Sequence, residues 1–150
     1  VGSEMCIRDS LEGWTLELFY GADGEFRRSR EQQIWGHYVG KIYYSGRESG
    51  SRIIARPPEP IPIPTPFDSV DLWGFGNRWR WARDETTPPA VIAVWVTDSK
   101  GKDYRIELTS IQWKQWWLIH RKVPSLILND IRLPAFFSCT PHLKREGTRS

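Results

Sequence analysis

The segment 96–108, which reads VTDSKGKDYRIEL, constrains the fold more than any other part of the sequence. Residues 98–101 (DSKG) fit a type I turn in which Gly101 takes the left-handed backbone conformation. Such a turn, with a bulge, commonly joins two antiparallel strands. After it, apolar and charged residues alternate over 104–108, as they do in a strand with one buried and one solvated face. The segment therefore predicts an antiparallel β-hairpin.

Strand signals also dominate the rest of the chain. Short runs rich in Val, Ile, Tyr, Trp and Thr are separated by Gly, Pro, Asp and Asn clusters, at the spacing of a sandwich or barrel. Further strands are expected at 14–20, 35–44, 51–57, 69–75, 90–98 and 115–123.

Two segments interrupt this pattern. In 58–66 every second residue is proline, which has no N–H to donate, so we expect an extended edge strand or a crossover there. The segment 23–35 competes as a helix but lacks a clear apolar stripe. We expect at most a short helical turn or an irregular connection in it.

Composition excludes several classes of protein. The chain has 150 residues, 39% hydrophobic and 26% charged, which is typical of one soluble globular domain. A net charge of +3 is too weak and scattered to indicate nucleic-acid binding, and no apolar run is long enough to span a membrane. Two cysteines, Cys6 and Cys139, make no disulfide framework. Nine tryptophans favour a binding role without fixing one, because indole rings fill cores as well as stack on ligands.

The two ends are set apart from the fold. Residues 1–10 resemble a translated sequencing adapter and are expected to be an artefactual or disordered tail. Residues 11–140 are the expected domain, and the polar segment 141–150 is expected to be a disordered tail. The chain is then a fragment of a larger, extracytoplasmic or secreted protein, and any signal peptide would lie outside it.

The order of motifs resembles the jelly-roll fold of galactose-binding-like domains, the scaffold of many carbohydrate-binding modules. The similar positions are 72–77 (LWGFGN), 98–101 (DSKG) and 111–116 (IQWKQW) followed by Pro124, and flagellar filament outer-layer proteins share a similar arrangement. The resemblance covers about 14–125 and implies an all-β antiparallel jelly-roll β-sandwich. Gln115 departs from the usual glycine, and the closing strand is not evident in 126–140. The latter suggests C-terminal truncation that leaves an unpaired sheet edge.

The loop after this first motif carries the candidate ligand site. The axial C–H faces of a pyranose pack on an indole plane, while its hydroxyls take hydrogen bonds from arginine and asparagine side chains. Residues 79 and 81 lie on the same side of an extended chain, so both rings could share one surface. The expected ligand-binding residues are Asn77, Arg78, Trp79, Arg80 and Trp81.

Two other interpretations of this loop stay open. Trp79 and Trp81 could cap the end of the fold while Trp73, Trp95 and Trp116 form its core. Alternating arginine and tryptophan also fits a groove for single-stranded nucleic acid. Acidic neighbours at positions 68, 71, 84 and 85 reduce the local positive charge, which disfavours the nucleic-acid interpretation.

Catalytic and metal signals are weak, so no catalytic residue is assigned. His37, His120 and His142 lack metal-ligand spacing. Asp103 and Glu107 lie on one strand face, and two carboxylates on a strand resemble those of a glycosidase, but a solvated face shared with Arg105 is the favoured explanation. No cofactor is expected. Oxygen donors at 98–103 and 82–85 leave a structural calcium ion as an option without an assigned ligand set.

These observations favour a non-catalytic module that binds carbohydrate or serves as a structural accessory. Its expected partners are a polysaccharide or neighbouring domains of the same chain, with neither nucleic acid nor membrane insertion. Two alternatives remain: a catalytic jelly-roll domain acting on polysaccharide, of lyase or glycosidase type, and a single-stranded nucleic-acid binder.

Overall fold

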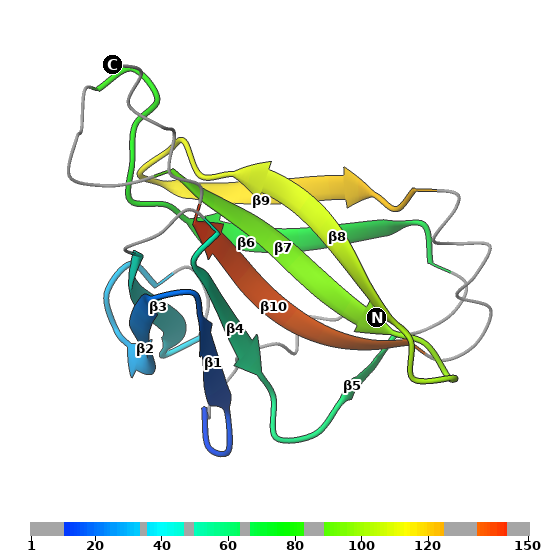
Figure 1. Ribbon diagram of the computed structural model, residues 1–150. Helices are drawn as coiled ribbons and strands as arrows, with labels where there is room; N and C mark the ends of the chain where they lie inside the picture. The colour runs from blue at the N-terminus through cyan, green and yellow to red at the C-terminus, as the bar shows by residue number, and fades with distance from the viewer. Residues whose placement is uncertain are drawn as a thin grey trace.

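The computed structural model describes residues 11–33, 36–46, 50–63, 67–82, 89–124 and, by its backbone, 135–143. Within these ranges all regular structure is β-strand and every ladder is antiparallel, which confirms the all-β expectation. The strands in Figure 1 are β1 (Thr15–Phe19), β2 (Ala22–Ser29), β3 (Val39–Gly46), β4 (Arg52–Arg56), β5 (Ile61–Ile63), β6 (Ser69–Phe75), β7 (Ala90–Thr97), β8 (Asp103–Ser110), β9 (Trp116–Lys122) and β10 (Ala135–Leu143).

The main sheet has the strand order β1-β4-β10-β7-β8. The short strand β5 pairs with the beginning of β10, where Pro62 lies opposite Phe136. Proline is tolerated here because β5 pairs with β10 alone among the described strands. The proline-alternating segment thus contains the edge strand that its sequence allows.

The core lies between the main sheet and the separate β6-β9 ladder, which Figure 1 shows behind β7 and β8. Val70 and Leu72 of β6 pack against the buried cluster, so one face of the ladder is covered and the other is turned away from the core. The buried cluster itself comprises Val94, Val96, Tyr104, Ile106, Leu108, Trp113, Ile119 and Val123.

The predicted β7-β8 hairpin is present. Gly101 has φ 81°, and its amide donates to the Asp98 carbonyl at 3.0 Å. The Asp98 carboxylate also accepts the backbone amides of Lys100 and Lys102, at 2.8 and 2.9 Å, and the Tyr104 hydroxyl at 3.2 Å. One nearly buried aspartate therefore organises the whole turn.

The expectation for 23–35 is wrong over its described first half, because β2 runs through it. β2 pairs with β3 from Ala22↔Gly46 to Ser29↔Val39. Its inward residues are Gly24, whose lack of a Cβ admits the Ile53 side chain, and Phe26, which meets the Trp14 ring edge-on at 5.5 Å. With only one large apolar residue on this face, the alternation is hard to see in the sequence.

The closing strand that the sequence does not reveal is β10. It lies inside the main sheet, where Cys139 is paired with Ala55 of β4 on one side and Val94 of β7 on the other. β10 continues to Leu143, so residues 141–143 belong to a strand and not to the tail expected from 141 onward. Residues 1–10 and 144–150 lie outside the described residues.

Candidate functional site

The loop that follows β6 is fixed to the segment before β9. The amides of Arg78 and Arg80 donate to the carbonyls of Trp113 and Gln112, both at 3.2 Å. A Cβ at Gly76 would lie 2.2 Å from the Trp113 carbonyl oxygen, so only glycine allows the two segments to lie so close. The expected ligand loop is thus a well-anchored element.

The two loop tryptophans have different environments. Trp79 packs against the buried core, whereas Trp81 is 76% exposed. Their rings stack at 4.4 Å between centroids with an interplanar angle of 27°. The rings face one another and therefore do not form the shared flat surface that the sequence suggested. The outer face of Trp81 is the part of this pair that a ligand can reach.

The polar residues of the loop are also divided between structural and solvent-facing roles. Asn77 donates from Nδ2 to the Tyr44 hydroxyl at 3.1 Å, which ties the loop to β3. Burial raises the pKa of Tyr44, although the bond to Asn77 acts in the opposite direction. Arg78 is partly buried and Arg80 is exposed. Of the five expected ligand residues, Asn77, Arg80 and Trp81 are exposed, and Asn77 is already bonded to Tyr44.

A larger aromatic surface lies on the outward face of the β6-β9 ladder. In its register Trp73 lies opposite Leu118 and Phe75 opposite Trp116. These four residues form what we call the aromatic strip. The exposed fractions of Trp73, Phe75 and Leu118 are 41%, 39% and 44%. The interpretation of Trp73 as core is therefore wrong, and Trp116 is only partly buried.

The aromatic strip has ordered neighbours. The Phe75 and Trp116 rings meet edge-on at 5.7 Å with an interplanar angle of 73°. The Trp116 indole Nε1 donates to the Gln32 carbonyl at 2.7 Å, which links the strip to the connection between β2 and β3. Next in register, His120 Nδ1 and Asp71 Oδ1 are 2.5 Å apart, and both side chains are exposed. Polar groups thus adjoin the apolar surface on the same face.

The alternation in SVDLWGF could have indicated this surface. Because side chains of a strand alternate between faces, Val70 and Leu72 toward the core require Trp73 and Phe75 to point away from it. A large aromatic side chain suits a core as well as an exposed surface, so for Trp73 the position in the alternation is the better guide.

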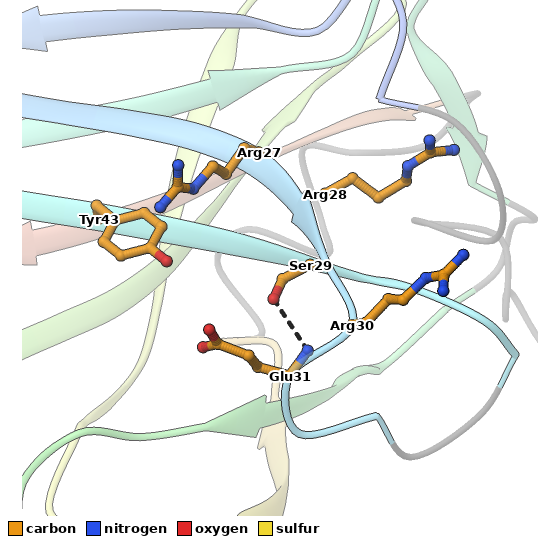
Figure 2. A pocket seen from close by; sticks show the side chains of 6 residues that line it. All are labelled: Arg27, Arg28, Ser29, Arg30, Glu31 and Tyr43. Atoms are coloured by element: carbon orange, nitrogen blue, oxygen red, sulfur yellow. Dashed lines mark hydrogen bonds between the residues drawn. The ribbon is translucent and has the colours of Figure 1, made fainter.

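The β2-β3 hairpin carries a second, charged surface. An open hollow of about 470 Å³ is lined by the side chains that Figure 2 draws as sticks, namely Arg27, Arg28, Ser29, Arg30, Glu31 and Tyr43. The Arg27 guanidinium lies 4.3 Å from the Tyr43 ring centroid and, together with Lys41, lowers the pKa of the Tyr43 hydroxyl. Arg30 donates to the Tyr38 hydroxyl at 2.9 Å and likewise lowers the pKa of that hydroxyl.

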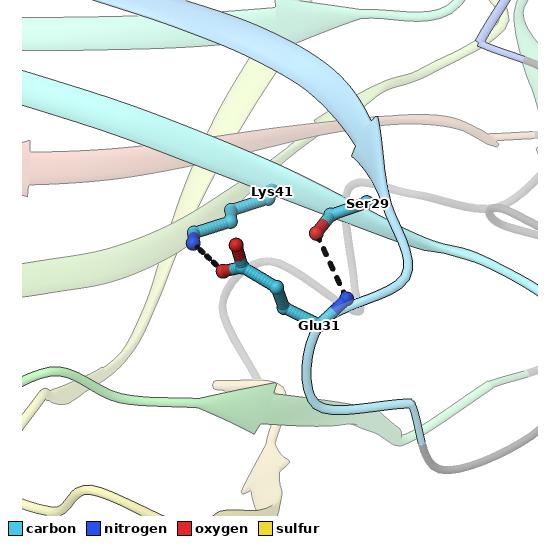
Figure 3. Close-up of polar contacts among 3 residues, drawn as sticks. All are labelled: Ser29, Glu31 and Lys41. Atoms are coloured by element: carbon cyan, nitrogen blue, oxygen red, sulfur yellow. Dashed lines mark hydrogen bonds and ion pairs between the residues drawn. The ribbon is translucent and has the colours of Figure 1, made fainter.

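The acidic residue Glu31 links the two sides of this hairpin. Figure 3 shows Glu31 in an ion pair with Lys41, while its amide donates to Ser29 Oγ at 3.0 Å. The ion pair lowers the pKa of the Glu31 carboxyl. Glu31 is therefore already engaged with a cation of the same hairpin.

The weak catalytic signals do not converge on one site within the described residues. Asp103 accepts from the Thr97 hydroxyl at 2.6 Å, and Glu107 pairs with Arg105 at 3.3 Å. The His37 carbonyl accepts a bond from the Gln33 side chain. The side chains of Cys139 and His142, like Cys6, lie outside the described part of the structure.

No group of three or more His, Cys, Asp or Glu side chains among the described residues could hold a metal ion. In the segment 98–103, which offers oxygen donors for calcium, the carboxylate oxygens of Asp98 accept hydrogen bonds from two turn amides and the Tyr104 hydroxyl. In the second such segment, 82–85, residues 83–85 lie outside the described ranges.

Comparison of the chain with family models, curated proteins and solved structures gives no match. In the part of the chain that the structure describes, no helix has the length and apolar character needed to cross a membrane.

Proposed function

We propose that this chain is a non-catalytic carbohydrate-binding module whose ligand lies across the aromatic strip. The observation that carries the proposal is the exposure of Trp73, Phe75 and Leu118 together on one face of the β6-β9 ladder. Each of these residues leaves about two fifths of its surface in water and so forgoes roughly 1 kcal/mol of burial, and an exposed group of them indicates a binding surface.

The shape and chemistry of the strip suit a sugar chain. Alternate residues on a strand are roughly 6.6 Å apart and neighbouring strands roughly 4.8 Å apart, so the strip offers a flat apolar area of sugar-ring dimensions. The indole of Trp73 can take the C–H face of a pyranose, while exposed Asp71 and His120 can exchange hydrogen bonds with its hydroxyls. The outer face of Trp81 offers an additional stacking position.

The proposal includes a fold type and a setting in a larger protein. A core enclosed between the main sheet and the β6-β9 ladder is compatible with a jelly-roll β-sandwich of the galactose-binding-like type. We infer that the module acts as an accessory in a larger extracytoplasmic protein. A structural role, in which a neighbouring domain of that protein covers the strip, is the competing function.

The proposal is tested by affinity electrophoresis through a panel of soluble polysaccharides and by a glycan array. Trp73→Ala is expected to weaken binding about tenfold or more, as loss of a central aromatic contact does. Tyr20→Ala is the matched control, because Tyr20 is an aromatic residue with 64% exposure outside the strip. A second pair, Leu118→Ala and Leu18→Ala, compares two leucines that are both 44% exposed.

Denaturation curves of all four variants establish that they are folded. If no glycan binds the unmodified protein, or if the strip variants bind as well as their controls, the carbohydrate proposal is wrong. The structural accessory role would then be the better account of the strip.

A further inference from the structure

The β2-β3 hairpin holds more positive than negative charge in its described part. Four cations lie on it or in the connection that follows β2, namely Arg27, Arg28, Arg30 and Lys41. Three carboxylates lie in the same region, at Asp23, Glu25 and Glu31, and two of them are paired with its cations. Glu31 pairs with Lys41, and Glu25 lies 3.9 Å from Arg27.

The other two arginines of the hairpin converge on one aromatic ring. The guanidinium carbons of Arg28 and Arg30 lie 4.0 and 5.1 Å from the centroid of the Tyr38 ring. Stacking on a ring orders a guanidinium while its N–H edge can still form bonds in its plane. Two ordered guanidinium groups held near each other repel, and an oxyanion bound by both would relieve that repulsion.

This cationic pair is connected to the aromatic strip. Gln32 follows Arg30 after one residue, and its carbonyl accepts the bond from Trp116 Nε1 at 2.7 Å. The end of the hairpin is therefore fixed directly to a member of the strip. A chain-like ligand on the strip would reach the hairpin without any rearrangement of the backbone.

We propose that the glycan bound by the aromatic strip is anionic, and that its carboxylate or sulfate groups pair with Arg28 and Arg30. This inference rests on the carbohydrate-binding function proposed above and adds the chemical class of the ligand. Bidentate bonds from guanidinium to these oxyanions provide the recognition, and the uncharged faces of the sugar rings pack on the strip. Since the arginines are on the surface, their contribution to the affinity for the glycan decreases as salt screens the charges.

The experiment measures binding of dextran sulfate, polygalacturonate and uncharged dextran by titration calorimetry at low and at physiological ionic strength. The variant R28Q/R30Q is compared with the unmodified protein. The control K100Q/K102Q removes the same charge from the β7-β8 turn, which Figure 1 shows at the opposite end of the main sheet. The strip variant W73A is measured with the same three polysaccharides.

The unmodified protein is expected to bind at least one polyanion more tightly than dextran. R28Q/R30Q should lose about tenfold or more of that affinity and most of its salt dependence, whereas K100Q/K102Q should lose little. Dextran sulfate and polygalacturonate separate recognition of sulfate from recognition of carboxylate. Equal affinity for dextran and the polyanions, or equal losses in the two charge variants, would overturn the inference.

The same data separate this inference from the function on which it rests. If W73A weakens glycan binding and R28Q/R30Q does not, the strip binds carbohydrate and the anionic site is wrong. If R28Q/R30Q weakens polyanion binding and W73A does not, the anion site exists but the strip is not the sugar surface. A single-stranded DNA oligonucleotide that binds more tightly than every polysaccharide would assign the arginines to phosphate, and would also overturn the inference.

Discussion

The carboxylate of Asp98 is the centre of the hydrogen bonds in the β7-β8 turn. Hydrogen bonds stabilise the charged form of the Asp98 carboxyl and lower the pKa of that carboxyl below the ordinary 3.8. The backbone amide of Lys102 contributes most, followed by the Lys100 amide and the Tyr104 hydroxyl. A lowered pKa in the folded state gives stability that is present above the unfolded value and is lost as the pH falls through the folded value. The contribution of Asp98 is therefore present above about pH 4 and decreases as the pH falls further.

This predicts a difference between the protein and Asp98→Asn in thermal melts from pH 7 to pH 2. An asparagine Oδ1 can still accept the turn amides but does not titrate. The melting temperature of the unmodified protein should fall more steeply below pH 4 than that of Asp98→Asn, and Asp98→Ala should be less stable at neutral pH. Parallel profiles for the unmodified protein and Asp98→Asn would show that Asp98 does not contribute in this way.

At the scale of elements, Gly76 determines how β6 leads into the ligand loop. A methyl group there would contact the Trp113 carbonyl at 2.2 Å and the Ile111 side chain at 2.6 Å, both far inside normal contact distance. Gly76→Ala should therefore force the loop away from the segment before β9 and lower the free energy of unfolding by about 2 kcal/mol. Urea denaturation measures this change.

Gly36→Ala provides the control for Gly76→Ala. Nothing lies within 4 Å of a Cβ at Gly36, although its φ of 68° adds some backbone strain. The decrease in the free energy of unfolding should be larger for Gly76→Ala than for this control. Similar losses would mean that close packing at Gly76 is not what matters.

The elements also show which parts of the fold can be predicted from sequence. The β7-β8 hairpin is predictable because its turn residues and its alternation are local and agree with each other. β2 is not, because its inward face depends on Gly24 and Phe26, and their partners Ile53 and Trp14 are distant in sequence. The position of Trp73 is not predictable from residue type, because large aromatic side chains suit cores as well as binding surfaces.

At the scale of the molecule, the site depends on contacts that no local pattern contains. The strip combines β6 with β9, and the bond from Trp116 to Gln32 links it to the hairpin across 84 positions of sequence. The sequence predicts a loop at 77–81, and these residues do lie outside the strands, after β6. Whether the two rings in that loop lie side by side or stack depends on the bonds that Arg78 and Arg80 make with the segment before β9.

The position of β10 makes the last prediction one about the whole molecule. β10 pairs with β7 from Phe136 to Leu143, and on its other side it pairs with β5 and β4. A chain ending at Pro124 would lose this central strand and leave unpaired backbone on β4 and β7 in the interior of the sheet. We expect it to show no cooperative urea transition and poorly dispersed amide signals in NMR spectra.

A chain ending at Leu143 is the control, because it keeps every described strand. It should unfold cooperatively, with a midpoint close to that of the full chain. A cooperative transition in the chain ending at Pro124 would mean that β1, β4, β7 and β8 form a stable sheet without β10. Without β10, the neighbouring strands β4 and β7, which run parallel to each other, cannot pair without moving. The strip packs on β7 and β8 through the inner face of its ladder, so it should lose its glycan binding in the same truncated chain.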